Sequence, residues 1–322
     1  MGFAEAQAML LAAGLGTRLW PLTSDRAKPA VPFLGRPLIA GVVELLAQHG
    51  IRRAVVNTHY QPASIHAALA DARGVEVRYS HEAEILGTAG GLAKGLAEGL
   101  LSPDLPTLIV NAKLYTDLDL AAVLRTHRAT GAKVTMALRT NAAREAFREV
   151  LVTGDRVTGF GIGRTPDPRS ERPLLFTGVH VISPEVLRGI RPGYSDTVAD
   201  VYPPLIAAGE VAAHVDDAGR WWELSTLERY LGLHRQAAEE GLGPDVVLSP
   251  GASVAPGAQV RRAILWEGAS VPAGADLEDV VLAAGVTLPA GARLRRVVVV
   301  RRDRAGPIER GTVEGELIHV PV

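Results

Sequence analysis

Short apolar runs and segments with helical spacing alternate along the first two-thirds of the chain. The apolar runs predict strands at residues 8–12, 53–57, 75–79, 107–111 and 133–138. Between them, helix-like segments lie at residues 37–49, 62–72, 88–100 and 118–130, and a glycine follows several of them. This alternation predicts an α/β fold with a mostly parallel sheet and helices on both of its faces.

From residue 139 to residue 182 the pattern becomes irregular and strand-like. Residues 150–153 and 156–160 flank the turn Gly154-Asp155, which predicts a hairpin. A further strand is expected at residues 175–181, and the last helix at residues 227–240. Ligands of open α/β sheets bind beyond the carboxyl ends of the strands. Four segments are therefore candidates to share one cleft: residues 14–18, 57–60, 81–91 and 111–115.

The last third of the chain repeats with a period of 17 residues. Leucine recurs at Leu248, Leu265 and Leu282, and glycines recur with the same period. Within each repeat the apolar positions are six residues apart, which predicts a triangular β-helix of about three coils. We therefore expect two domains, residues 1–243 and residues 244–322.

Composition narrows the class of protein. The chain has 322 residues and a formal net charge of −1, so its charge favours neither nucleic acid nor a membrane surface as a partner. It has no cysteine, which excludes disulfides and thiolate metal sites. Residues 1–6 show no leader pattern, and no apolar run approaches about 18 residues. We expect a soluble, cytoplasmic protein.

The first predicted strand leads into a glycine loop with two cations. Gly14 and Gly16 let the backbone approach a ligand, and bare N–H groups in such a loop attract anions. Arg18 and Lys28 add charge-assisted donors of the kind that hold phosphates. The loop is not a Walker sequence, because no Gly-Lys-Ser/Thr follows, and it lacks the third glycine of a dinucleotide fingerprint.

The whole string Leu-Ala-Ala-Gly-Leu-Gly-Thr-Arg-Leu-Trp-Pro-Leu-Thr, followed by Lys28-Pro29, resembles the signature of the sugar-1-phosphate nucleotidyltransferases. The segment Glu82 to Gly91 resembles a second motif of that family, and residues 175–181 resemble a third. The resemblance implies a Rossmann-like domain followed by a short left-handed parallel β-helix. It implies nucleotide binding by Ala12, Gly14, Gly16, Thr17, Arg18, Gly87, Thr88 and Gly91, sugar binding by Thr177 and Gly178, and catalytic charge neutralisation by Arg18 and Lys28.

The sequence departs from the family where a metal is expected. The family's strand ends in Gly-Asp, and that Asp binds Mg²⁺, but here Ala112-Lys113 follows. An ammonium cannot ligate Mg²⁺, which takes oxygen ligands. Asp117 and Asp119 lie nearby, but their spacing favours the cap and first turn of the next helix. Glu223 replaces the family's second metal-binding Asp and is the one expected metal carboxylate that remains.

Two functions follow from these observations. The first is nucleotidyl transfer from an NTP to a sugar-1-phosphate, giving an NDP-sugar and pyrophosphate, with GTP and mannose-1-phosphate ranked first because the predicted coil resembles mannose-1-phosphate guanylyltransferases. The alternative is a catalytically impaired homologue that binds a nucleotide or nucleotide-sugar and regulates or scaffolds a partner. Lys113 and Glu223 favour the alternative, whereas the intact loop favours the enzyme. For the coil, oligomerisation is a better interpretation than acyl transfer, because no histidine lies between His234 and His319.

Overall fold

The computed structural model describes residues 6–322, and the chain forms two compact units that interleave in sequence. The first unit contains residues 6–14, 42–59 and 71–221, and the second contains residues 15–41, 60–70 and 222–322. The predicted domain boundary after residue 243 stays a prediction. The prediction that residues 1–6 carry no leader sequence concerns mainly residues 1–5, which lie outside the described residues.

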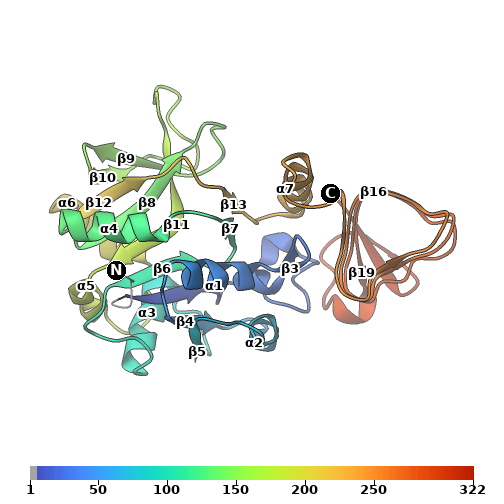
Figure 1. Ribbon diagram of the computed structural model, residues 1–322, viewed down its shortest axis with the longest axis horizontal. Helices are drawn as coiled ribbons and strands as arrows, with labels where there is room; N and C mark the ends of the chain where they lie inside the picture. Colours follow the sequence, from blue (N-terminus) through green and yellow to red (C-terminus); the bar gives the residue numbers. More distant parts are fainter. Residues whose placement is uncertain (1–5) are drawn as a thin grey trace. The chain divides into compact units, whose positions relative to one another are not determined.

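The helices and strands follow the predicted alternation (Figure 1). Up to residue 130 they are β1 (Gln7–Leu11), the 3-10 helices η1 (Thr17–Leu19) and η2 (Lys28–Ala30), β2 (Pro32–Phe33), β3 (Arg36–Pro37), α1 (Leu38–Gln48), β4 (Arg53–Thr58), α2 (Pro62–Ala68), β5 (Glu76–His81), α3 (Gly87–Ala97), β6 (Thr107–Asn111), β7 (Leu114–Thr116) and α4 (Leu120–Thr130). They continue with β8 (Val134–Thr140), β9 (Glu149–Thr153), β10 (Arg156–Phe160), β11 (Leu174–Ile182), α5 (Pro184–Gly189), the π-helix η3 (Thr197–Val201), α6 (Tyr202–Ala207), β12 (Val211–Val215), β13 (Trp221–Glu223) and α7 (Leu227–Glu239). The last elements are β14 (Val246–Leu248), β15 (Ser253–Val254), β16 (Gln259–Leu265), β17 (Ser270–Val271), β18 (Asp276–Leu282), β19 (Arg293–Arg301), the 3-10 helix η4 (Arg302–Arg304), β20 (Thr312–Glu314) and β21 (Leu317–Pro321).

A nine-stranded sheet forms the centre of the first unit, in the order β5-β4-β1-β6-β11-β8-β12-β10-β9. Strands β5, β4, β1 and β6 are parallel, as expected, but β11 runs antiparallel to both β6 and β8. The prediction of a mostly parallel sheet is therefore wrong, and the sheet is mixed. A run of buried apolar residues predicts a strand without fixing its direction, so β11 could not be oriented from its sequence.

The core of the first unit packs helix α3 against the parallel strands. Met9, Val55 and Ile109, from β1, β4 and β6, belong to one buried cluster with Ala89 and Leu92 of α3. Removing a fully buried side chain of this size from water stabilises a fold by about 1.5–3 kcal/mol. This packing fixes the start of α3 close to the carboxyl ends of the parallel strands.

The second unit contains the predicted coil. The strands of the coil stack on one another (Figure 1). Strands β14, β16, β18 and β19 pair in parallel, and each register joins residues 17 positions apart, such as Leu248 with Leu265 and Leu265 with Leu282. Strand β21 then pairs antiparallel with β19, and β20 pairs with β21. The 17-residue period is therefore confirmed as the stacking period of the coil. Among residues 6–322, no helix has the length and apolar character needed to cross a membrane.

Candidate functional site

The glycine loop of the second unit turns at Gly16, which has a φ of +69° and directly precedes η1. Such a φ favours glycine over any residue with a side chain. A Cβ placed on Gly16 would lie 3.1 Å from Cβ of Lys28 and 3.2 Å from Cγ2 of Thr23. The Thr23 hydroxyl also donates to the Gly16 carbonyl oxygen at 3.1 Å. The structure therefore brings Lys28 against the glycine turn, ten residues after Arg18 in the chain.

The loop is open to solvent at the positions expected to hold phosphate. Gly14, Thr17 and Arg18 are exposed, and a Cβ on Gly14 would meet no atom within 4 Å. Within the described part of the chain, the backbone N–H groups of residues 13–18 donate no hydrogen bond, and the Arg18 guanidinium forms no ion pair. Unbonded N–H groups beside a cation make an anion-binding concavity. Packing within the protein therefore does not require glycine at position 14. Close approach of a ligand to the backbone would require it.

Two parts of the second unit support this loop from outside. Tyr60 donates from its hydroxyl to the carbonyl oxygens of Thr23 and Ser24, each at 2.9 Å. On the coil, Trp266 lies 4.5 Å beneath the Arg26 guanidinium, and Ala305 accepts a hydrogen bond from the Trp20 indole at 3.4 Å. The segment between Arg18 and Lys28 is thus fixed by residues far from it in sequence.

In the first unit, a buried polar network joins the ends of three parallel strands. Ala12 N–H, directly after β1, donates to Oδ1 of Asn57 at 2.7 Å. Asn57 Nδ2 donates to Oε1 of Glu82 at 2.8 Å, and Leu86 N–H donates to Oε2 of Glu82 at 3.0 Å. Asn57 is 3% exposed and Glu82 is 1% exposed. Every hydrogen-bonding atom in this chain of contacts has a partner, as buried polar groups require.

The glycines at the start of α3 make room for neighbouring parts of the first unit. A Cβ on Gly87 would overlap the carbonyl of Ser195, and one on Gly90 would overlap the carbonyl of Gly193. The Ser195 carbonyl oxygen also accepts from Ala89 N–H at 2.9 Å and from Gly90 N–H at 3.2 Å. Close packing within the unit therefore accounts for Gly90, and at Gly87 it acts together with a φ of +74°, which also favours glycine.

Thr88 and Gly91, both expected to bind nucleotide, have partners within the first unit. The Thr88 hydroxyl donates to Oδ2 of Asp196 at 2.9 Å. A Cβ on Gly91 would lie 2.8 Å from Oε1 of Glu82 and 2.9 Å from Nδ2 of Asn57. Glycine at position 91 is thus what lets the buried amide and carboxylate meet.

The two residues expected to bind sugar lie at the middle of β11. Thr177 is 1% exposed, and its hydroxyl donates to the Ala137 carbonyl oxygen at 2.7 Å. Gly178 has a φ of +78°, and a Cβ there would overlap the Asn111 side chain. Asn111 is the last residue of β6, so Gly178 lies at the end of that strand. The proton of the Thr177 hydroxyl is committed to the fold, which leaves the backbone at 177–178 for ligand contacts.

The turn after β6 carries Lys113 beside β1, because Ala112 N–H donates to the Leu11 carbonyl oxygen at 3.1 Å. The two nearby carboxylates have other partners. Asp117 pairs with Arg220 at 2.9 Å, and Asp119 caps α4 by accepting from Ala122 N–H at 2.9 Å. Burial opposes the ionised form of Asp119, but the bonds from Ala122 and Arg125 outweigh it and lower its pKa.

The residues present do not fit a magnesium ion held by two protein carboxylates. Lys113 offers no oxygen, and no cluster of three histidine, aspartate or glutamate side chains suited to a metal occurs among residues 6–322. Glu223, in the second unit, is 9% exposed, and its carbonyl oxygen accepts from the Arg229 guanidinium at 2.8 Å. It is the one carboxylate at an expected metal position.

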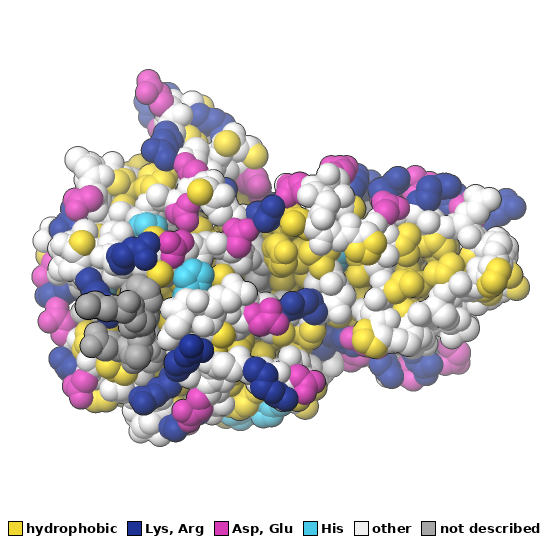
Figure 2. Space-filling view, viewed as in Figure 1, with side chains coloured by type: hydrophobic (Ala, Val, Ile, Leu, Met, Phe, Trp, Pro, Cys, Tyr) yellow, Lys and Arg dark blue, Asp and Glu magenta, His cyan; other side chains and the backbone are white. Residues whose placement is uncertain are grey.

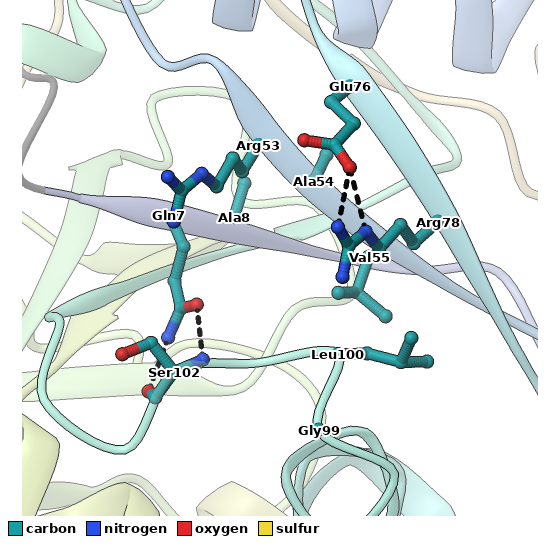
Figure 3. A pocket seen from close by; sticks show the side chains of 10 residues that line it. All are labelled: Gln7, Ala8, Arg53, Ala54, Val55, Glu76, Arg78, Gly99, Leu100 and Ser102. Atoms are coloured by element: carbon teal, nitrogen blue, oxygen red, sulfur yellow. Dashed lines mark hydrogen bonds and ion pairs between the residues drawn. The ribbon is translucent and has the colours of Figure 1, made fainter.

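A cavity of about 280 Å³ lies at the opposite ends of the parallel strands (Figure 3). Its lining includes Gln7, Arg53 and Glu76, which are the first residues of β1, β4 and β5. Gln7 is bonded there to the Ser102 backbone through both its amide nitrogen and its oxygen, at 2.8 and 2.7 Å. The cavity therefore does not belong to the loops that follow these strands.

Sequence reasoning missed the parts played by Asn57 and Glu82. Both were inside candidate segments, but neither was singled out as a functional residue. The available signal was a polar residue at the end of each of two apolar strands. The register that places Leu11 opposite Asn57 turns this signal into a contact with the glycine loop.

Comparison with known proteins identifies the class to which this fold and site belong. The family model described as nucleotidyl transferase matches residues 7–240, and the one described as the GlmU-like C-terminal hexapeptide matches residues 233–316. The chain belongs to the nucleotidyl transferase family and carries a hexapeptide-repeat region at its C-terminal end.

Individual relatives show which members of the family the chain resembles. The chain is 31% identical over 267 residues to mannose-1-phosphate guanylyltransferase of Mycobacterium tuberculosis, a match that covers 79% of this chain and 73% of that protein. It is 30% identical over 278 residues to UTP–glucose-1-phosphate uridylyltransferase of Synechocystis, covering 78% and 68%. It is 29% identical over 272 residues to the catalytic subunit beta of mannose-1-phosphate guanylyltransferase of Drosophila pseudoobscura, covering 79% and 72%.

Proposed function

We infer that this chain is an enzyme that transfers a nucleotidyl group from an NTP to a sugar-1-phosphate, forming an NDP-sugar and pyrophosphate. The observation that carries this function is the open loop of residues 13–18. Its N–H groups donate no hydrogen bond among residues 6–322, Arg18 is exposed, and Lys28 packs on Gly16. The relatives are named as sugar-1-phosphate nucleotidyltransferases. The alternative of a catalytically impaired homologue receives no support from these relatives.

The reaction needs positioning and charge neutralisation more than covalent work by the protein. A phosphate oxygen of the sugar-1-phosphate attacks the α-phosphorus of the NTP. The bond from that phosphorus to the oxygen bridging the β-phosphorus breaks, and pyrophosphate leaves with that electron pair. We propose that Ala12, Gly14, Gly16 and Thr17 hold the nucleotide, while Arg18 and Lys28 neutralise the triphosphate and the leaving group.

For the substrates we propose GTP and mannose-1-phosphate first. Two of the three relatives described above are mannose-1-phosphate guanylyltransferases, and the third is a uridylyltransferase for glucose-1-phosphate. The residues proposed to face base and sugar are Gly87, Thr88, Gly91, Thr177 and Gly178. Since the hydroxyls of Thr88 and Thr177 donate within the fold, their contributions would come from backbone groups.

Magnesium is implied by the family, but the residues at position 113 and around it do not fit a two-carboxylate site. We propose that the Lys113 ammonium supplies a fixed positive charge on the turn beside β1, and that Glu223 is the remaining carboxylate for a metal. The test is Lys113→Met, which removes the charge without adding a metal ligand, with pyrophosphate release measured over a series of Mg²⁺ concentrations. Lys113→Met should require more Mg²⁺ than the unchanged chain, and an identical Mg²⁺ dependence would contradict this role.

Four further properties remain proposals. The coil is proposed to be left-handed and to mediate homo-oligomerisation, on the strength of its hexapeptide match. A cytoplasmic location is proposed because the chain has no cysteine for disulfides. Figure 2 shows Lys and Arg side chains interspersed with Asp and Glu on the visible face, which agrees with the proposal of no nucleic-acid partner.

The experiment is pyrophosphate release measured with Mg²⁺ for each pairing of GTP, UTP, dTTP and ATP with mannose-1-phosphate or glucose-1-phosphate. We expect turnover, highest with GTP and mannose-1-phosphate. Arg18→Gln should lower kcat/KM at least tenfold, because a charged donor to phosphate is lost. Arg53→Gln, at the amino-terminal end of β4, is the control and should leave kcat/KM unchanged. A folded chain that releases no pyrophosphate from any pairing would refute the proposed function.

A further inference from the structure

We propose that Asn57 and Glu82 are positioning residues, which together hold the start of the glycine loop at a fixed place relative to the loop before α3. This inference rests on the proposed function, because the glycine loop is where the nucleotide is expected. Neither side chain is exposed enough to be a ligand itself, at 3% and 1%. Their effect on the reaction would be transmitted through the backbone of Ala12 and Leu86.

The network reaches the loop through a single backbone group. Ala12 and Ala13 are the last buried residues before the exposed Gly14, and the Ala12 N–H donates to Asn57 Oδ1 at 2.7 Å. The next six N–H groups, of residues 13–18, have no acceptor within the described residues. The peptide that carries the Ala12 N–H is therefore the last fixed point before the open anion-binding turn. A small rotation of that peptide would change the direction in which the following N–H groups point.

The other end of the network fixes the entry to α3. Glu82 Oε2 accepts from Leu86 N–H at 3.0 Å, and the Leu86 carbonyl oxygen accepts from Ser195 N–H at 3.0 Å. Glu82 is itself tied to β4, because its N–H donates to the Thr58 carbonyl oxygen at 2.7 Å. The peptide units before and after the Leu86 Cα are thus each held by one hydrogen bond. The network connects the ends of β1, β4 and β5 to the start of α3.

The direction of each hydrogen bond in this network is determined. Ala12 N–H and Leu86 N–H can only donate, so Asn57 must present its oxygen to Ala12 and its NH₂ group to Glu82. Both oxygens of Glu82 must then accept. Gly91 completes the arrangement, because a Cβ there would lie within 3 Å of both side chains. If the Glu82 carboxylate is replaced by an amide, one N–H donor must face another. This holds for either orientation of the Asn57 amide and of the new amide at position 82.

This logic gives an exchange experiment. In Glu82→Gln, a buried donor loses its acceptor, and in Asn57→Asp, two carboxylate oxygens face each other. In the double variant, the new carboxylate at position 57 accepts from Ala12 N–H and from the NH₂ group of the new amide at position 82. The oxygen of that amide accepts from Leu86 N–H. The double variant keeps three hydrogen bonds and one negative charge, with only the central bond reversed. We expect each single variant to lower kcat/KM for GTP roughly tenfold to hundredfold, and the double variant to recover most of it.

A control separates positioning from stability. Gln7→Leu removes the buried amide at the other end of β1, which bonds to Ser102 and Thr107 and is 3% exposed (Figure 3). It should lower the melting temperature as the single variants do, while leaving KM for GTP unchanged in the folded protein. If the single variants lose melting temperature but keep the KM and kcat of the control, the two residues are structural and the proposal is refuted. A double variant no better than the worse single variant also refutes it.

Backbone amide exchange makes the test independent of turnover. In the single variants, the N–H groups of Ala12 and Leu86 should exchange with solvent at least tenfold faster, and the double variant should restore their protection. Unchanged exchange at both positions would overturn the proposal even if the enzyme is active. Absence of pyrophosphate release by the unchanged chain, together with the expected exchange pattern, would refute the proposed function and leave the positioning network standing.

Discussion

In the first unit, the glycines at the start of α3 lie against other parts of the chain, whereas several glycines of the coil face open space. A Cβ on Gly90 would overlap the Gly193 carbonyl, and one on Gly91 would crowd Asn57 and Glu82. In the coil, Gly274 and Gly291 have φ values of +74° and +70°, and a Cβ on either would meet nothing within 4 Å. Gly90 and Gly91 are thus needed for the space they leave, whereas Gly274 and Gly291 are needed for the backbone conformation they allow.

Charged side chains differ between the regions in the same way. Glu82 is buried in a network of fixed hydrogen bonds, whereas Arg262, Asp279 and Glu278 form ion pairs along the surface of stacked coils. A buried polar group without a partner costs about 1–3 kcal/mol, whereas an exposed ion pair contributes roughly 0–1 kcal/mol. The loss of unfolding free energy on substitution should therefore depend more on the surroundings of a residue than on its type.

The largest expected difference is between two helical glycines with ordinary φ values. Gly90→Ala in α3 places a methyl group on the Gly193 carbonyl and should lower the free energy of unfolding by more than about 3 kcal/mol. Gly232→Ala in α7 meets nothing within 4 Å and should raise it by about 0.5–1 kcal/mol. Urea unfolding of both variants measures this difference. Equal effects of the two substitutions would show that crowding does not govern the glycines of the first unit.

Two buried histidines extend the comparison to pH. His180 lies in the sheet of the first unit, and neither ring nitrogen has a hydrogen-bond partner among the described residues. Its burial lowers the pKa of His180 to about 3. Burial also lowers the pKa of His234 in α7 to about 4, although its Nδ1 bonds to the Tyr230 carbonyl and its Nε2 accepts from Leu34 N–H. Both rings are neutral in the folded chain at pH 5, but an unfolded histidine, with a pKa near 6.5, is protonated there.

Because the unfolded chain binds these protons and the folded chain does not, stability should fall as pH decreases from about 6.5 towards 4 and 3. The slope is about 1.4 kcal/mol per pH unit for each histidine. His180→Leu should remove its share of this dependence and change the free energy of unfolding little at pH 7, since no hydrogen bond is lost. His234→Leu should cost about 1–3 kcal/mol at pH 7, because it leaves Leu34 N–H without its acceptor. Urea unfolding at pH 7 and pH 5 tests both; an unchanged pH slope in His180→Leu would contradict the assignment.

The sequence was most informative where structure depends on local repetition. The 17-residue period predicted the coil register, since each residue stacks on the one 17 positions later. It was least informative about neighbours far apart in the chain. The carbonyl of Gly193, more than a hundred residues after Gly90, explains why position 90 is a glycine, and no pattern near residue 90 reveals it. The bond from Ala12 to Asn57 likewise depends on β1 and β4 being adjacent, with Leu11 opposite Asn57.

A smaller effect is expected for a glycine of the coil. Gly274→Ala keeps open space around the new methyl group but forces alanine to a φ of +74°, which should cost about 1–2 kcal/mol. Gly274→Asn should cost less, because asparagine tolerates this conformation better. Thermal unfolding of the two variants provides the measurement. If both are as damaging as Gly90→Ala, the coil glycines are also constrained by their neighbours.

The smallest effect is expected from removing one charge of the coil surface. Asp279 has a φ of +54° and pairs with Arg262 at 2.8 Å. Asp279→Asn keeps the side-chain shape and a residue that tolerates this φ, so the charge and one of the two hydrogen bonds from Arg262 are lost. The hydrogen bond and charge of Arg262 lower the pKa of Asp279, so its contribution is present at neutral pH and is lost on acidification below about pH 4.

Glu82→Gln is the matched change in the first unit, since both substitutions replace a carboxylate by an amide. Asp279→Asn should lower the free energy of unfolding by less than about 1 kcal/mol, and 1 M salt should shrink this loss further. Glu82→Gln should cost more at any salt concentration, because burial shields its network from screening and one donor loses its acceptor. Urea unfolding at low and high salt compares the two. If both variants lose the same stability and both losses shrink in salt, Glu82 contributes no more than a surface charge does. The proposed contrast between buried and surface charges would then be wrong.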